Sequence, residues 1–97
     1  MANAEAGSVK AMFNVALFFN MGTGVGHDAR MAAKWYTRAA EAGNARAQYK
    51  LGLCYRDGTG VARDFSAARR WLTRAAAAGV ARASAALAQL DADEAAQ

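Results

Sequence analysis

Two residue types that constrain most small folds are nearly absent from these 97 residues: the chain has no proline, and Cys54 is its single cysteine. One thiol excludes an internal disulfide framework. Because β-branched residues are also few and alanine, leucine and arginine are common, intrinsic propensities favour helix along most of the chain. We therefore predict an all-α fold in a single domain that spans residues 1–97.

Residues that usually carry catalysis or bind metals are equally scarce. His27, the only histidine, lies in a predicted turn, and Cys54 occupies an apolar helical position that favours a small buried hydrophobe over a nucleophile. One histidine and one cysteine fall short of a zinc site. The Gly-Thr-Gly turns lack the lysine of a phosphate-binding loop. We expect no enzyme activity, no catalytic residue, no cofactor and no metal.

Long apolar runs are missing as well. No run approaches the roughly 20 residues of a membrane-spanning helix. No N-terminal segment joins a basic flank to an uninterrupted apolar stretch, as a signal peptide does. We expect a cytoplasmic protein, and a mature secreted or periplasmic form is the alternative.

Acidic residues are few and unevenly placed. The whole chain carries a formal charge of +4, but three of its eight acids lie in the C-terminal tail. Residues 1–90 therefore carry +7, from twelve basic and five acidic residues. An excess of this sign favours an acidic partner surface or an anionic peptide. The alternative explanation is solubility alone.

What the chain does have is an internal repeat of 36 residues. Sliding the sequence by this length aligns Gly7 with Gly43 and Gly79, and sixteen of the 36 positions are identical between residues 4–39 and 40–75. Chance does not produce this agreement, even where alanine is abundant. We predict repeat one at about 7–42, repeat two at about 43–78, a half repeat at 79–91 and an acidic tail at 91–97.

Each copy has the pattern of a helix, a glycine-rich turn and a second helix, which predicts an α/α solenoid of about two and a half repeats and about five helices. The first helix is predicted at about 8–21 and again at about 44–57, with Ser8 and Asn44 at the N-cap positions. In the third copy the N-cap position is Val80, which has no side-chain oxygen to cap the helix.

The residues predicted to be structural recur in both copies: Gly22 and Gly58, Gly24 and Gly60 in the turns, Asp28 and Asp64 as N-caps of the second helices, and Trp35 and Trp71. The apolar stripe of the second helix contains the tryptophans, which we expect to be the largest single contributors to the core. Ala16 and Gly52 mark a close approach of two backbones.

The pattern resembles the Sel-one-like repeat, a subclass of the tetratricopeptide-like α/α solenoids. The residues that carry the resemblance in the second copy are Leu51-Gly52, Tyr55, Gly58-x-Gly60-Val61, Asp64, Ala68, Trp71 and Ala75-Ala76-x-x-Gly79. The resemblance implies a right-handed superhelix whose first helices line a concave face. It also implies an adaptor or scaffold rather than a catalyst.

A concave face lined by the first helices would carry a basic row, because Lys10, Arg46 and Arg82 share one register. The predicted partner groove consists of Lys10, Phe13, Leu17, Asn20, Arg46, Tyr49, Leu53, Arg56 and Arg82. Cations beside apolar anchors suit a peptide that bears carboxylates. We predict a protein–protein interaction scaffold or adaptor, and the alternative is a dedicated inhibitor or immunity-type protein that sequesters one effector.

Two other surfaces are distinguished by comparing the copies. Met12, Phe18 and Met21 are more apolar than their counterparts in the second copy. This face would pair with another copy, bind a partner helix or be covered by a repeat absent from this chain, and of the three we favour self-association into a homo-oligomer. Cations around Arg70 and Arg74 lie on a predicted outer helix. No nucleic-acid-binding fold or stacking platform accompanies them, so nucleic acid is an unlikely partner.

Overall fold

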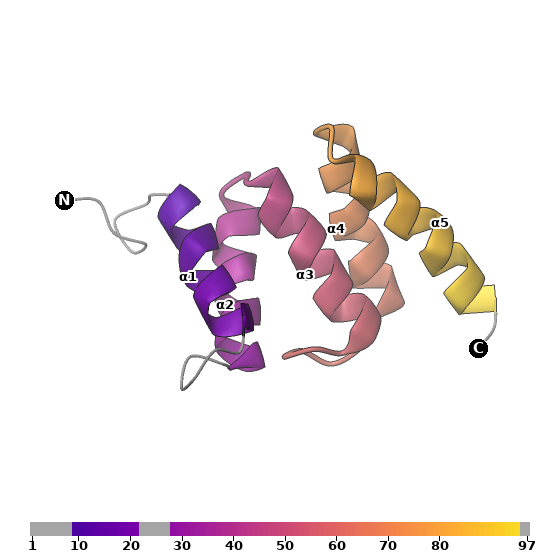
Figure 1. Cartoon of the computed structure of the whole chain (residues 1–97). Coiled ribbons are helices and arrows are strands. Elements are labelled where there is room, and N and C mark those ends of the chain that lie inside the picture. Colours follow the sequence, from indigo (N-terminus) through magenta and orange to yellow (C-terminus); the bar gives the residue numbers. More distant parts are fainter. Residues whose placement is uncertain (1–8, 22–27, 96–97) are drawn as a thin grey trace.

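The computed structural model of the chain describes residues 9–21 and 28–95, and these form five α-helices and no strand (Figure 1). The helices are α1 (Val9–Met21), α2 (Ala29–Glu41), α3 (Ala45–Asp57), α4 (Phe65–Ala77) and α5 (Ala81–Ala95). The all-α repeat fold predicted from the sequence is confirmed.

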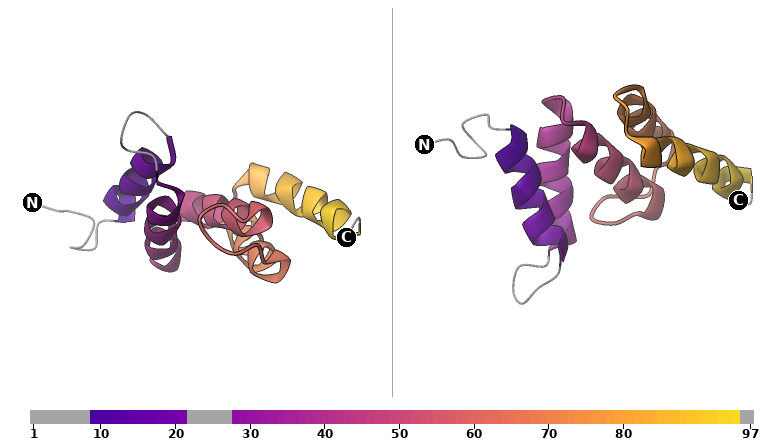
Figure 2. Two further views of the ribbon diagram at one scale, coloured as in Figure 1. Left: turned by 90° about the horizontal axis from the view of Figure 1, so that it is seen from below. Right: turned by 45° about the horizontal axis from the view of Figure 1, so that its top comes forward.

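The five helices lie in two layers. The left panel of Figure 2 shows α1, α3 and α5 on one side and α2 and α4 on the other; we refer to them as the inner and the outer helices. Each helix packs against the next one in the sequence, and α3 also contacts α5. The molecule is elongated, with extents of 46 × 29 × 17 Å. Contacts between neighbouring elements are typical of a solenoid.

Asp28, Asn44 and Asp64 cap the helices that follow them, as predicted. Asp28 Oδ1 accepts hydrogen bonds from the backbone N–H groups of Arg30 and Met31 (3.1 and 3.2 Å), Asn44 Oδ1 from that of Ala47 (2.9 Å), and Asp64 Oδ1 from that of Ala67 (3.1 Å). These bonds satisfy amides that have no partner inside the first helical turn. Helix α5 begins instead with a backbone bond from Ala83 N–H to the carbonyl of Val80 (3.0 Å).

The turn between α3 and α4 packs against the preceding repeat. Gly60 has a φ of 76°, and a Cβ atom at this position would lie 2.6 Å from the carbonyl carbon of Ala29, at the start of α2. A Cβ at Gly52 would lie 2.7 Å from Leu72 Cγ and 3.3 Å from the backbone oxygen of Ala68, so the predicted close approach of two backbones is confirmed at Gly52. Both glycines are therefore needed for the space they leave, and Gly60 also for its left-handed backbone.

Two clusters of buried residues hold the helices together, and α3 lies between them. The first joins α1, α2 and α3 through Met12, Phe13, Ala16, Ala32, Tyr36, Ala39, Ala40, Ala47, Leu51 and Cys54; the second joins α4 and α5 through Ala68, Leu72, Ala75, Ala83, Ala86 and Leu90. Tyr55 of α3 packs against both clusters. Helix α3 is thus held in place by packing against a cluster on each side.

The tryptophans, expected to be the largest single contributors to the core, lie at its edge and not at its centre. Trp35 and Trp71 are only partly buried, at the edge of the first cluster. The next residue in each helix, Tyr36 or Leu72, is fully buried instead. In each repeat the arginine three residues after the tryptophan places its guanidinium over the indole ring, at 4.7 and 4.9 Å from the centroid. Each ring therefore covers the core and stacks with a cation at the surface.

Helix α5 continues through the predicted acidic tail as far as Ala95. Two of the tail acids face the outer helix α4, where the guanidinium of Arg69 pairs with Asp91 Oδ1 at 2.6 Å and with the carboxylate of Glu94. These pairs hold the end of α5 against α4. They also neutralise one cation of the outer surface.

Candidate partner-binding groove

Two adjoining hollows lie along the inner helices. The N-terminal hollow, of about 480 Å³, lies between α1 and the start of α3 and is lined by Lys10, Phe13, Asn14, Leu17, Asn44, Ala45 and Arg46. The central hollow, of about 360 Å³, reaches from α1 across α3 to the start of α5 and is lined by Phe13, Arg46, Tyr49, Lys50, Val80 and Arg82. Phe13 and Arg46 line both hollows, so the two adjoin, and we refer to them together as the groove.

The groove combines a cationic rim with an apolar floor. Lys10, Arg46, Lys50 and Arg82 supply the charge, and none of the described residues that line the two hollows is acidic. Phe13 is only 8% exposed and packs in the first cluster, with its ring centroid 6.0 Å from that of Tyr36. The floor is therefore part of the folded core and does not need a ligand to order it.

Six of the nine residues predicted for the partner groove lie in these two hollows: Lys10, Phe13, Leu17, Arg46, Tyr49 and Arg82. Leu53 lies in a smaller pocket farther along α3, and Arg56 is paired with its neighbour Asp57. The side chain of Asn20 is outside the described residues, as are the side chain of Met21 and all of Ser8, Gly22, Gly24 and His27.

Arg56 does not contribute a free charge to the groove. Its Nε donates to Asp57 Oδ1 at 2.8 Å and its Nη2 to Asp57 Oδ2 at 2.9 Å. This two-point hydrogen bond is the main cause that raises the pKa of Arg56 above its ordinary value. A carboxylate on a partner would have to compete with Asp57 for this guanidinium.

Sequence comparison missed Lys50, which lines the central hollow. Its counterparts one repeat away are Asn14 and Ala86, so the cation does not recur and the alignment of copies gave no signal. Helical spacing was the available signal, because Lys50 follows Arg46 by four residues and therefore lies on the same face of α3. Its ammonium lies 5.9 Å from the ring centroid of Tyr49.

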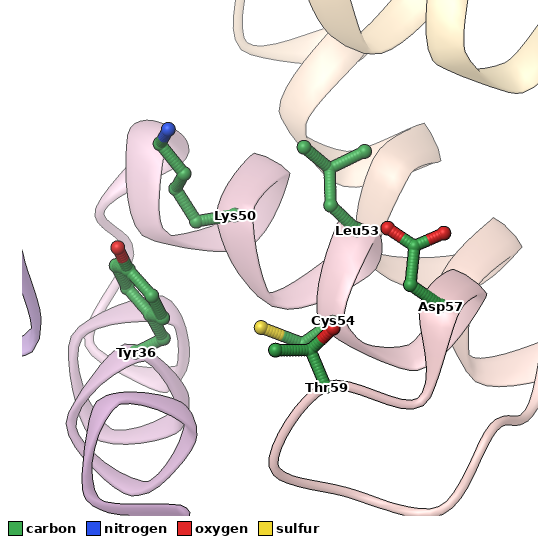
Figure 3. A pocket seen from close by; sticks show the side chains of 6 residues that line it. All are labelled: Tyr36, Lys50, Leu53, Cys54, Asp57 and Thr59. Carbon is green, nitrogen blue, oxygen red and sulfur yellow. The ribbon is translucent and has the colours of Figure 1, made fainter. Parts of the chain in front are cut away.

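Lys50 also borders a smaller pocket of about 150 Å³, here called the α3 pocket. Its lining residues are Tyr36, Lys50, Leu53, Cys54, Asp57 and Thr59 (Figure 3). Figure 3 shows Cys54 beside Thr59, whereas the ammonium of Lys50 points away from both. The charge of Lys50 is therefore directed out of the α3 pocket.

The environment of Cys54 suits a structural residue. The side chain is 7% exposed and belongs to the first cluster, which confirms the prediction of a buried hydrophobe. Burial and, to a smaller extent, the charge of Asp57 raise the pKa of its thiol from the ordinary 9.0 to about 11, against the charge of Lys50, which lowers it. The thiolate needed for nucleophilic chemistry is thus disfavoured at neutral pH.

The apolar face predicted for self-association is not formed as expected. Phe18 is 53% exposed, but Met12 is only 7% exposed and packs in the first cluster. Phe13 and Ala16 lie on the face of α1 that packs against the core. Met12 precedes Phe13 and lies one helical turn from Ala16, so it is buried on the same face. The inclusion of Met12 in an exposed face was therefore wrong.

Within the described residues, no group of three or more histidine, cysteine, aspartate or glutamate side chains has an arrangement that could hold a metal ion. The same part of the chain contains no helix long and apolar enough to cross a membrane.

Comparison with known proteins agrees with the repeat pattern. The family model described as "Sel1 repeat" matches residues 9–44 and 45–80. The crystal structure of a Sel1 repeat protein from Oxalobacter formigenes is similar over 90% of the chain, with a TM-score of 0.87 and 39% sequence identity. The chain spans 25% of the length of that protein. No curated protein gives a match.

Proposed function

Since the chain belongs to the Sel1 repeat family, we propose that it is a protein-binding scaffold that holds an acidic peptide segment of its partner in the groove of the inner helices. Sel1 repeats are generally protein–protein interaction modules, and the proteins that contain them are typically non-enzymatic scaffolds. The expectation that this chain is not an enzyme is kept as part of the proposal.

One observation carries the proposal: Phe13 and Arg46 line both hollows, so the two hollows adjoin. An extended segment that follows the groove meets a cation in each hollow and apolar side chains between them. The planar guanidinium of arginine binds a carboxylate through two parallel hydrogen bonds, and apolar walls provide anchors for side chains between the acids.

The expected affinity is modest. Arg46 and Arg82 are exposed, and exposed ion pairs contribute at most about 1 kcal/mol each. Most of the binding free energy must then come from apolar contacts with residues such as Leu17 and Tyr49, which are only partly buried. We expect dissociation constants on the order of 1–100 μM for a single peptide, the range of a transient interaction.

The test is a pair of matched charge reversals. Arg46→Glu with Arg82→Glu alters two cations of the groove that are one repeat apart. Lys34→Glu with Arg70→Glu alters two exposed cations of the outer helices, also one repeat apart, by the same formal charge. Peptides selected from a display library rich in Asp and Glu are titrated against both variants by calorimetry.

We expect the groove variant to lose about tenfold or more in affinity, because two attractive contacts become repulsive. The outer-helix variant should change by less than about threefold, through long-range charge alone. Equal losses in both variants would mean that overall charge governs binding, and an unaffected groove variant would place the site elsewhere.

The role of the chain as scaffold or inhibitor, its compartment and the class of its partner are proposals as well. Capture of the partner by crosslinking and mass spectrometry decides between scaffold and inhibitor: a scaffold joins two proteins, whereas an inhibitor abolishes the activity of the one it binds. We keep the cytoplasm as the expected compartment and nucleic acid as an unlikely partner.

Self-association remains a proposal that now depends on Phe18, whose ring is half exposed. If this face joins two copies, Phe18→Ser shifts a dimer to a monomer in sedimentation at high micromolar concentration. A parent chain that is strictly monomeric under the same conditions would contradict the proposal.

A further inference from the structure

The central hollow carries more positive charge than a single carboxylate requires. Arg46 and Lys50 come from successive turns of α3, and Arg82 comes from the first turn of α5. No acid stands among the described residues that line this hollow. Among the described residues, ion pairs engage Arg56 and Arg69 rather than these three cations.

The three cations are placed against fixed walls. Phe13 is buried, Tyr49 is partly buried and packs against the second cluster, and Val80 packs against the same cluster at the start of α5. The stem of Lys50 is partly buried, and its ammonium lies 5.9 Å from the centre of the Tyr49 ring. Since α3 is packed from both sides, Arg46 and Lys50 project from a rigid element, which lowers the entropy lost on binding.

Building on the proposed function, we infer that the anionic group received by the central hollow is the phosphate monoester of a phosphoserine or phosphothreonine side chain in the partner peptide. The inference follows from a comparison of charge. A carboxylate carries one negative charge and two acceptor oxygens, so it would leave most of the positive charge of this hollow unmatched.

A phosphate monoester carries about −1.5 to −2 at neutral pH and three acceptor oxygens. It therefore offers one oxygen to each of Arg46, Lys50 and Arg82. Two of these cations are arginines, whose planar donors bind phosphate in a fixed geometry, and the lysine supplies a compact charge. Clusters of this kind are typical of proteins that recognise phosphorylated motifs.

The N-terminal hollow determines which kind of peptide side chain is accepted next to the phosphate. It has two cations, Lys10 and Arg46, but it is larger and its wall includes the apolar side chains of Phe13 and Leu17. An apolar side chain of the peptide fits this wall while the phosphate occupies the central hollow. The predicted motif is a phosphorylated residue with an apolar residue a few positions away.

The experiment uses three peptide libraries that are identical except at one central position, which is serine, glutamate or phosphoserine. Arrays of all three are probed with the whole chain, and the best flanking sequence is then synthesised in the three forms for titration by calorimetry. We expect the phosphoserine form to bind about tenfold or more tightly than the glutamate form, and the serine form to bind most weakly.

Two variants test which cation discriminates. Lys50→Met keeps the apolar stem and removes the charge, so the ratio of affinities for phosphoserine and glutamate peptides should fall towards one; Lys50→Arg should restore it. Lys34→Met, on the exposed face of α2, is the matched control and should leave the ratio unchanged.

A change of pH separates the two anions independently. Between about pH 7.5 and about pH 5.5 the phosphate gains a proton, because its second pKa is about 6, whereas glutamate stays ionised. Lysine and arginine side chains stay charged across this interval. The phosphoserine peptide should lose a few-fold in affinity on acidification, and the glutamate peptide should not.

The outcomes distinguish this inference from the proposed function on which it rests. Equal affinity for the glutamate and phosphoserine forms overturns the phosphate inference and leaves acidic-peptide binding in place. Binding of the phosphoserine form that is unaffected by Lys50→Met also overturns the assignment of the central hollow. Failure of all three libraries to yield a binder overturns the proposed function together with the inference.

Discussion

The two repeats perform the same structural tasks with different surroundings. Asp28 and Asp64 cap the outer helices, and Tyr36 and Leu72 fill the same register position at the centre of a core. Each outer helix also stacks an arginine on its tryptophan. The copies differ on the inner helices, because α3 packs against α2, whereas no described helix precedes α1.

Two pairs of residues at equivalent positions of the repeats show how this difference affects burial. Cys54 is 7% exposed against the first cluster, whereas its counterpart Phe18 is 53% exposed. Gln48 is buried and its amide donates to the carbonyl of Ala40 at 3.1 Å, whereas its counterpart Met12 is buried as an apolar residue. The same position in the repeat is thus buried, exposed or hydrogen-bonded according to the residues that surround it.

The largest effect on stability is expected at the contact between the α3–α4 turn and the start of α2. Gly60→Ala would force a Cβ into the carbonyl group of Ala29 while the backbone keeps a φ of 76°. Neither backbone can move without opening the contact, so we expect a loss of about 4 kcal/mol or more in the free energy of unfolding.

Gly58→Ala is the matched control, since a Cβ there would have its nearest neighbour at 3.4 Å and only the left-handed φ of 74° is unfavourable. It should cost about 1–2 kcal/mol. Urea titration followed by circular dichroism measures both; similar losses would show that the contact with Ala29 contributes little.

The next effect compares adjacent residues of α4. Leu72→Ala empties a fully buried position and should destabilise the fold by about 3 kcal/mol. Trp71→Ala removes a larger side chain that is only partly buried, together with the stacking of the Arg74 guanidinium on it, and should cost about 1–2 kcal/mol. Thermal and urea unfolding give the order, and a larger loss for Trp71 would return the tryptophan to the centre of the core.

A third test uses the thiol of Cys54, which is buried, whereas its counterpart Phe18 in the first repeat is exposed. The pKa of Cys54 is raised to about 11, so the unfolded chain releases this proton at lower pH than the folded chain does. The free energy of unfolding should therefore fall by about 2 kcal/mol as pH rises from about 9 to about 11. The contribution is fully present below about pH 9 and is lost above it.

Cys54→Ala separates this effect from the other groups that titrate at high pH. The variant has a cavity that lowers stability at every pH, but it should lack the additional decrease between about pH 9 and about pH 11. Parallel pH slopes for the parent and the variant would contradict the raised pKa.

These comparisons also show how far the sequence alone reaches. The helix bounds and the capping aspartates of the outer helices recur every 36 residues, so aligning the copies predicts them, and the glycine at position 52 of α3 predicts the close approach there. Lys50 was missed because it does not recur, and Met12 was misplaced because its burial depends on the rotation of α1 against its neighbours. Position in a repeat gives the role of a residue in the fold, but its exposure depends on which helices adjoin it.

The smallest effect comes from exchanging the residues at one register position. Met12→Gln places an amide among the buried apolar residues of the first cluster, and removing this amide from water should cost about 1–2 kcal/mol. Gln48→Met loses the bond to the Ala40 carbonyl, but this carbonyl still accepts the backbone N–H of Gly43 at 3.1 Å, so the cost should stay within about 0.5 kcal/mol. Urea unfolding of both variants tests the asymmetry. If Gln48→Met proves the more damaging of the two, the hydrogen bond between the repeats, rather than apolar packing of the inner helix, is what the position requires.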